Sequence, residues 1–223
     1  MNNGAINEER FFIPVPEAER VSAVWTWPAR PTIVMALAHG AGANMDHSFM
    51  QALAQELAAH DLAVLRFNFL YMEKKQKRPD PPAMAHRVLR LAWQVAHDRF
   101  PSLPLIAAGK SFGGRMASQS LAREPDNRVK ALVFFGFPLH PANKPGTERA
   151  AHLKAVAVPL LFLQGTRDAL ADLSLLAPIV SALPNGSLAT FEGVDHSFQR
   201  GKTNAVPALA KTASEWLFSL KFD

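Results

Sequence analysis

The segment Leu103-Pro104-Leu105-Ile106-Ala107-Ala108-Gly109-Lys110-Ser111-Phe112-Gly113-Gly114-Arg115 decides the fold. An apolar run ends in a Gly-x-Ser-x-Gly turn, and a helix-prone segment at residues 116–123 follows directly. This order of strand, sharp turn and helix is what a nucleophile elbow requires, because the strained turn lifts the serine hydroxyl clear of the sheet. Gly109, Gly113 and Gly114 leave room where a Cβ atom would collide with the neighbouring strand and helix. The segment predicts that Ser111 is a nucleophile, and an ordinary turn serine is the alternative.

Length and composition indicate one globular α/β domain over residues 1–223, with 48% apolar and 19% charged residues. Cysteine is absent, which excludes disulfides, a cysteine nucleophile and thiolate metal sites, and fits a reducing cytoplasm. We find no uninterrupted apolar run of about 18 residues, as a membrane span would need. The N-terminal segment lacks the basic and apolar regions of a secretory signal. We therefore expect a cytoplasmic protein with no membrane partner.

The chain carries a formal net charge of +5, which raises the possibility of a nucleic-acid partner. The one dense basic run is Lys74-Lys75-Gln76-Lys77-Arg78, and it lies in a proline-rich loop without interleaved aromatic residues. Such runs are usually solvated surface. We therefore expect no nucleic-acid partner.

Apolar runs alternate with segments of helical spacing along the chain. Strands are expected at residues 32–38, 62–67, 105–108, 129–135, 160–164 and 187–191, with two short antiparallel edge strands inside residues 11–27. Helices are expected at about residues 46–60, 84–99, 116–123, 170–183 and 205–220, with a short helical piece at 152–156 and loops at 68–82 and 136–150. This alternation predicts an α/β fold with a mostly parallel, doubly wound sheet and helices on both faces.

Polar residues that can carry out chemistry follow three of the expected strands. Ser111 follows the strand at 105–108, Asp168 follows the strand at 160–164, and His196 follows the strand at 187–191. In an open α/β sheet functional groups collect at the carboxyl ends of the strands. His196 would take the proton of Ser111, and Asp168 would hold the tautomer of His196 and stabilise its imidazolium. The backbone N–H groups of Phe112 and Ala41 would form the oxyanion hole.

Other acidic residues could compete for the role of the acid. Asp168 could instead only cap the helix expected near Leu170, since aspartate is a favoured N-cap residue. Asp172 is expected about one turn into that helix, facing solvent. Asp195 adjoins His196, and adjacent residues rarely reach each other's ring nitrogen, so we interpret it as structural.

Several basic residues near the expected site have alternative roles. His47 is expected at a helix start and His39 is expected to brace the oxyanion loop, so both are weaker candidates for the base than His196. Lys110 could favour an anionic substrate, or its stem could pack while its ammonium group pairs elsewhere, which we favour. Arg115 is expected to form a salt bridge rather than to contact substrate.

Five short motifs carry a family resemblance: HGAG, GKSFGGR, FGFPLHP, QGTRD and VDHSF. With them the sequence resembles the α/β-hydrolase superfamily over nearly its whole length. Within that superfamily it resembles a small, lid-poor group related to dienelactone hydrolases. That group includes bacterial predicted hydrolases and vertebrate relatives known as a testis-expressed protein and a subunit of a chromatin acetyltransferase complex. The resemblance implies about eight strands, one of them antiparallel near the start, and a hydrolase triad. A cap domain is missing or reduced to residues 137–158, and Lys110 departs from the neutral residue of many relatives.

These observations predict a serine hydrolase that uses an acyl-enzyme mechanism on a small carboxylic ester, thioester or related acyl substrate. A substrate pocket is expected to include Asn68, Phe69, Tyr71, Leu139 and His140. No cluster has metal-ligand spacing and no phosphate-binding loop is present, so we expect no metal and no cofactor. The same residues could serve an acyltransferase, and a catalytically weak interaction scaffold is a further alternative. We expect a monomer or a homodimer.

Overall fold

The computed structural model describes residues 5–16, 19–201 and 203–222. Its centre is an eight-stranded sheet in the order β1-β2-β4-β3-β5-β6-β7-β8. The strands are β1 (Asn7–Pro14), β2 (Arg20–Trp27), β3 (Ile33–Ala38), β4 (Leu62–Phe67), β5 (Leu105–Lys110), β6 (Val129–Phe135), β7 (Leu160–Gly165) and β8 (Gly186–Phe191). Strand β2 is antiparallel to both β1 and β4, and all pairs from β4 to β8 are parallel. The expected mostly parallel sheet with one antiparallel strand is confirmed.

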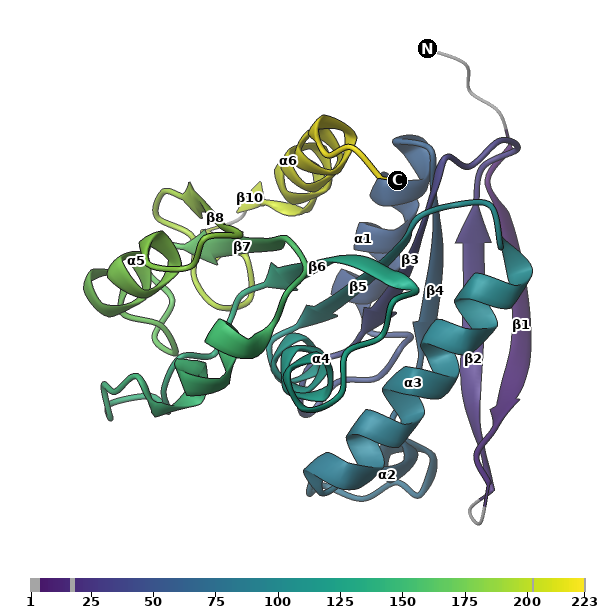
Figure 1. Ribbon diagram of the computed structural model, residues 1–223, viewed down its shortest axis with the longest axis horizontal. Coiled ribbons are helices and arrows are strands. Elements are labelled where there is room, and N and C mark those ends of the chain that lie inside the picture. The colour runs from purple at the N-terminus through teal and green to yellow at the C-terminus, as the bar shows by residue number, and fades with distance from the viewer. Residues whose placement is uncertain (1–4, 17–18, 202, 223) are drawn as a thin grey trace.

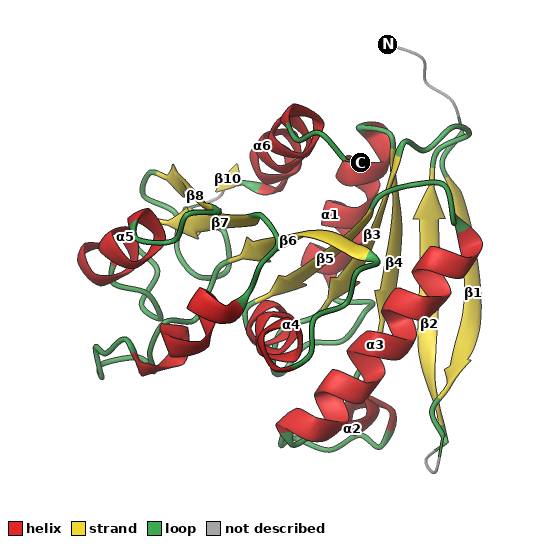
Figure 2. Cartoon of the chain, viewed as in Figure 1, coloured by secondary structure: helices red, strands yellow, loops and turns green. Residues whose placement is uncertain are grey.

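Helices cover both faces of this sheet, as Figures 1 and 2 show. The helices are α1 (Ser48–Ala59), α2 (Leu70–Glu73), α3 (Pro82–Arg99), α4 (Phe112–Arg123), the 3-10 helix η1 (Glu148–Ala155), α5 (Leu173–Ser181) and α6 (Val206–Ser219). Helices α1 and α6 pack on one face, and α3, α4, α5 and η1 pack on the other. A small hairpin of β9 (Gln199–Arg200) and β10 (Thr203–Asn204) precedes α6. In the described residues no helix is long and apolar enough to cross a membrane.

The two helical layers enclose two separate hydrophobic clusters. Successive side chains of a strand point to opposite faces of a sheet, so one buried strand supplies both clusters. In β3, Val34 and Ala36 belong to the cluster beneath α3 and α4, whereas Met35 and Leu37 belong to the cluster beneath α1 and α6. This two-sided burial explains why the parallel strands are nearly continuous apolar runs.

The expected strands agree with the structure closely, and the differences lie in the helices and loops. Helix α4 begins at Phe112, directly after the serine, rather than at residue 116. The segment expected to be a loop after β4 contains the short helix α2. Between β6 and β7 the chain forms only loops and η1, so the cap is minimal, as expected.

Candidate active site

Ser111 occupies the sharp turn between β5 and α4. Its backbone has φ 50° and ψ −111°, a region that residues other than glycine rarely adopt. A Cβ atom at Gly113 would lie 2.6 Å from the Ala38 carbonyl oxygen, so glycine is needed for the helix to approach β3. Ser111 is the N-cap residue of α4, yet its side chain makes no capping hydrogen bond. The hydroxyl is therefore available to another partner.

That partner is His196, which follows β8. The Oγ atom of Ser111 lies 2.8 Å from Nε2 of His196, and Nδ1 of His196 lies 2.7 Å from Oδ2 of Asp168. With the Asp168 carboxylate accepting a hydrogen bond from the protonated Nδ1, Nε2 carries no proton and can accept the Ser111 proton. The structure thus brings the three expected residues together from the ends of three different strands.

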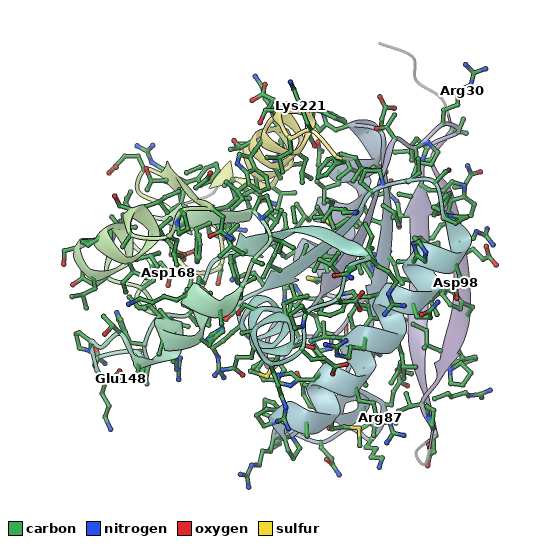
Figure 3. All side chains as sticks on the ribbon, viewed as in Figure 1. Arg30, Arg87, Asp98, Glu148, Asp168 and Lys221 are labelled. Carbon is green, nitrogen blue, oxygen red and sulfur yellow. The ribbon has the colours of Figure 1, made fainter. Side chains whose placement is uncertain are left out.

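Asp168 is held by further hydrogen bonds on the β7–α5 connection, at the far side of the molecule from β1 and β2 (Figure 3). Its Oδ2 accepts a hydrogen bond of 2.5 Å from Nε2 of Gln164, and its Oδ1 accepts one of 2.8 Å from the amide of Leu170. Gln164 in turn accepts a hydrogen bond from the Phe137 amide through Oε1. Gln164 was not among the expected site residues, although it lies in the QGTRD motif at the strand end.

The capping role considered as the alternative for Asp168 is wrong, because α5 begins only at Leu173 and the bond from the Leu170 amide to Asp168 lies in the loop before it. Asp172 was expected one turn inside the following helix, and this is wrong. Helix α5 starts at Leu173, and Asp172 is its N-cap residue, whose carboxylate accepts a hydrogen bond from the Ser174 amide at 2.8 Å.

The loop that carries His196 is stabilised by its own aspartate. The carboxylate of Asp195 accepts hydrogen bonds from the amides of Ser197 at 2.8 Å and Gln199 at 3.0 Å. A Cβ atom at Gly165 would lie 2.2 Å from the Val194 carbonyl oxygen, so glycine lets the loops that carry Asp168 and His196 approach closely. Asp195 is thus structural, in agreement with its interpretation above.

The amides of Phe112 and Ala41 are the donors expected for an oxyanion hole. Phe112 is the first residue of α4, so its N–H has no partner inside the helix. Ala41 lines the same cavity as Ser111. Within residues 5–16, 19–201 and 203–222, no acceptor is bonded to the amide of either residue. Both donors are free to bind a ligand oxygen.

His39 and His47 have the structural roles expected of them, His39 beside the loop after β3 and His47 at the start of a helix. Nε2 of the buried His39 accepts a hydrogen bond from the Phe69 amide, and its Nδ1 lies 2.8 Å from the Gly40 carbonyl oxygen, to which it donates. Burial lowers the pKa of His39 to about 4, so the ring is neutral at pH 7. Nδ1 of His47, the N-cap residue of α1, accepts a hydrogen bond from the Phe49 amide.

A cavity of about 210 Å³ opens beside Ser111. It is formed by the loop after β3, the start of α1, the elbow and the loop after β8. Its lining residues are Gly40, Ala41, Gly42, Ala43, His47, Phe49, Met50, Lys110, Ser111, His196 and Ser197. Phe49 and Met50 are the apolar residues of α1 in this lining, and neither was among the expected site residues.

The five residues expected to form the pocket do not line this cavity, so that expectation is wrong. Phe69, Tyr71 and Leu139 are fully buried in the hydrophobic cluster beneath α3 and α4. Helix α2 turns Phe69 and Tyr71 inward, whereas Leu139 is buried in the loop after β6. Asn68 stabilises the loop between β3 and α1, since its Oδ1 accepts a hydrogen bond from the Met45 amide. Nε2 of His140 accepts a hydrogen bond from the amide of the α5 N-cap residue.

Lys110 and Arg115 differ in whether their charged side chains have a polar partner. Nζ of Lys110 donates a hydrogen bond of 2.6 Å to the His196 carbonyl oxygen, so the ammonium pairs away from the nucleophile, although the residue lines the cavity. Arg115 makes no ion pair with any residue that the structure describes, and its buried Nε has no partner, so the expected salt bridge is wrong. Burial and the neighbouring Arg149 lower the pKa of Arg115.

In the described part of the chain, no group of three or more His, Cys, Asp or Glu residues could hold a metal ion.

Comparison with known proteins places this arrangement in context. Residues 31–215 match the model of an alpha/beta hydrolase domain family. Similar solved structures include a dienelactone hydrolase from Anabaena variabilis, with 22% identity, TM-score 0.75 and coverage of 96% of this chain and 97% of that one. An alpha-beta serine hydrolase homologue from Coxiella burnetii has 21% identity, TM-score 0.73 and coverage of 97% and 96%. A serine hydrolase without a lid from Xanthomonas campestris has 18% identity, TM-score 0.74 and coverage of 99% of both chains.

Curated relatives carry a different kind of name. Two Mycobacterium tuberculosis proteins, from strains CDC 1551 and H37Rv, are provisionally named phosphoribosyl transferases and are 27% identical over 208 residues. The match covers 91% of this chain but only 44% of those proteins. The chain therefore spans less than half the length of the curated relatives that it matches.

Proposed function

The chain belongs to the alpha/beta hydrolase domain family, and from this premise we propose that it is a serine hydrolase acting on small acyl substrates such as carboxylic esters or thioesters. The observation that carries the proposal is the hydrogen-bonded series from Ser111 through His196 to Asp168, with contacts of 2.8 Å and 2.7 Å. Serine, base and acid in this arrangement are the requirements for nucleophilic acyl transfer.

The proposed reaction proceeds in two halves. Oγ of Ser111 attacks the acyl carbon while its proton passes to Nε2 of His196, and the carbonyl oxygen becomes an oxyanion. The amides of Phe112 and Ala41 donate hydrogen bonds to this oxyanion. The intermediate collapses to an acyl-serine as the leaving alcohol or thiol takes the proton from His196. Water then attacks the acyl-serine with His196 again accepting a proton, and the acid and free Ser111 are released.

Asp168 would act through the base rather than on the substrate. Its carboxylate fixes the tautomer of His196 and stabilises the imidazolium that forms in each half-reaction. Because Gln164 and the Leu170 amide also bond to this carboxylate, its orientation is fixed before substrate arrives.

The dimensions of the cavity support a small acyl group. Drug-sized ligands occupy pockets of roughly 300–1,000 Å³. The cavity beside Ser111 measures about 210 Å³ and is bounded by Phe49 and Met50. We therefore propose a short acyl chain next to the serine, with the leaving group directed toward the open side that the minimal cap leaves free.

A fluorophosphonate probe tests this function directly. We expect the wild-type protein to be labelled at Ser111 and the Ser111→Ala variant to remain unlabelled. Turnover of p-nitrophenyl acetate should fall by roughly 10⁴-fold or more in the His196→Ala variant. Failure of the wild type to react under conditions that label a control esterase would remove the basis of the proposal.

The transferase name of the Mycobacterium tuberculosis relatives supports a different reaction only weakly, since the matched segment makes up less than half of those proteins. Diphosphate release from phosphoribosyl diphosphate, measured on the same preparation, distinguishes the two activities. We expect hydrolysis of the ester and no release of diphosphate.

A further inference from the structure

Lys110 directly precedes Ser111, and its side chain reaches the loop that carries His196. Its Nζ donates a hydrogen bond of 2.6 Å to the His196 carbonyl oxygen. The same nitrogen lies 5.1 Å from the ring centroid of Phe198 and 5.9 Å from that of Phe49. One side chain thus connects the strand end before the nucleophile to the backbone of the base.

The backbone of His196 has little other support. Among the residues that the structure describes, the bond from Lys110 is the only hydrogen bond to the main chain of His196. The carboxylate of Asp195, the residue before His196, accepts hydrogen bonds from the amides of Ser197 and Gln199, which follow it. The ring of His196 meets its two partners only if the backbone sets it at the correct distance from Ser111.

An ammonium group at this position carries a free-energy cost. Burial lowers the pKa of Lys110 to about 8, and the negative charges of Asp168 and Asp195 offset only part of that effect. A methionine of similar length would pack beside Phe49 and Phe198 without a buried charge. Packing alone therefore does not account for the ammonium group, whereas a charge-assisted hydrogen bond to a carbonyl oxygen does.

We propose that Lys110 is a positioning residue for the base. By binding the His196 carbonyl oxygen, it fixes the imidazole ring relative to the hydroxyl of Ser111. This inference rests on the proposed hydrolase function. Because the bond starts from the residue next to the nucleophile, any displacement of the elbow carries the base with it, and the 2.8 Å contact is preserved.

The absence of cysteine from the chain allows a selective test. In the Lys110→Cys variant, the new thiol is the only one in the protein. Treatment with 2-bromoethylamine forms a carbon–sulfur bond with loss of bromide and a proton, which restores an amine at nearly the length of lysine. Treatment with iodoacetamide instead attaches a neutral carbamidomethyl group, with loss of iodide and a proton. Lys130→Cys, on an exposed position of β6, is the matched control.

The rate constant for fluorophosphonate labelling of Ser111 is the main measurement. We expect Lys110→Cys to react roughly 10–100-fold more slowly than wild type, since a small displacement of a catalytic group has effects of this size. Aminoethylation should recover most of the rate, and carbamidomethylation should not. The Lys130→Cys series should keep the wild-type rate throughout. Wild-type labelling by folded Lys110→Cys, or equal recovery with both reagents, would overturn the proposal.

A second measurement does not depend on activity. Hydrogen exchange at the amides of Ser197 and Phe198 should be faster in Lys110→Met than in wild type, while amides of α3 exchange equally in both. Unchanged exchange in the loop would refute the positioning role. If wild type is not labelled by the probe, the hydrolase proposal fails, and this exchange experiment still decides whether Lys110 holds the His196 loop.

Discussion

Replacement of Lys110 by methionine should change how the stability of the protein depends on pH. Burial lowers the pKa of Lys110 from 10.5 to about 8 in the folded protein. Between these two values the unfolded chain holds a proton that the folded chain has released, so the free energy of unfolding rises with pH. At about 1.4 kcal/mol per pKa unit, the full shift corresponds to about 3 kcal/mol. Lys110→Met lacks this contribution.

Urea unfolding at pH 7, 8, 9 and 10, monitored by tryptophan fluorescence, measures the free energy of unfolding of wild type and of Lys110→Met. The free energy of unfolding of wild type, relative to Lys110→Met, should increase by about 2–3 kcal/mol across this range. Groups that titrate in both proteins cancel in the comparison, among them Tyr71, whose pKa burial raises to about 12. Lys130→Met controls for the loss of one positive charge. A constant difference between wild type and Lys110→Met from pH 7 to pH 10 would refute the reasoning.

Three further predictions concern the acid, the elbow and the cavity. Asp168→Asn should lower kcat for an ester by about 10⁴-fold with little change in KM, because the tautomer of His196 is no longer fixed; steady-state kinetics checks this, and a loss below tenfold would argue for another acid. Gly113→Ala should cost about 1–3 kcal/mol in thermal unfolding, because its Cβ would lie 2.6 Å from the carbonyl oxygen at the end of β3. Gly42→Ala, with open space around the new methyl group, is its control and should cost about 1 kcal/mol from its positive φ alone. Met50→Ala should shift the preferred p-nitrophenyl ester toward longer acyl chains, and an unchanged preference would place the acyl group elsewhere.

The central parallel strands could be predicted closely because their sequences are nearly continuous apolar runs that end at a glycine or a polar residue. Strand β4 and strand β6 have the predicted bounds. The start of α4 could not be predicted, because Gly113 and Gly114 are typical of a turn. In the structure Gly113 lies against the end of β3 and Gly114 against Gly109 of β5, so the helix can start immediately after the serine.

The order of Ser111, Asp168 and His196 along the chain was informative because all three lie at carboxyl ends of parallel strands. Sequence could not identify the cavity. The aromatic residues after β4 follow a strand end, as a pocket residue would, but α2 turns Phe69 and Tyr71 into the core. Phe49 and Met50 line the cavity because of how α1 packs across the loop after β3. This packing cannot be predicted from a local sequence pattern.

The sheet divides the interior into two hydrophobic compartments, and the elbow is where they adjoin. Phe112 packs into the compartment of α3 and α4, whereas Lys110 extends toward Phe49 and Phe198 in the compartment of α1 and α6. Substitutions in different compartments share no partners, so their effects on unfolding should be additive. The residues of one compartment can therefore be substituted without changing the effect of substitutions in the other. Non-additive effects on the free energy of unfolding should be concentrated at Lys110 and Phe112, the two residues that flank Ser111.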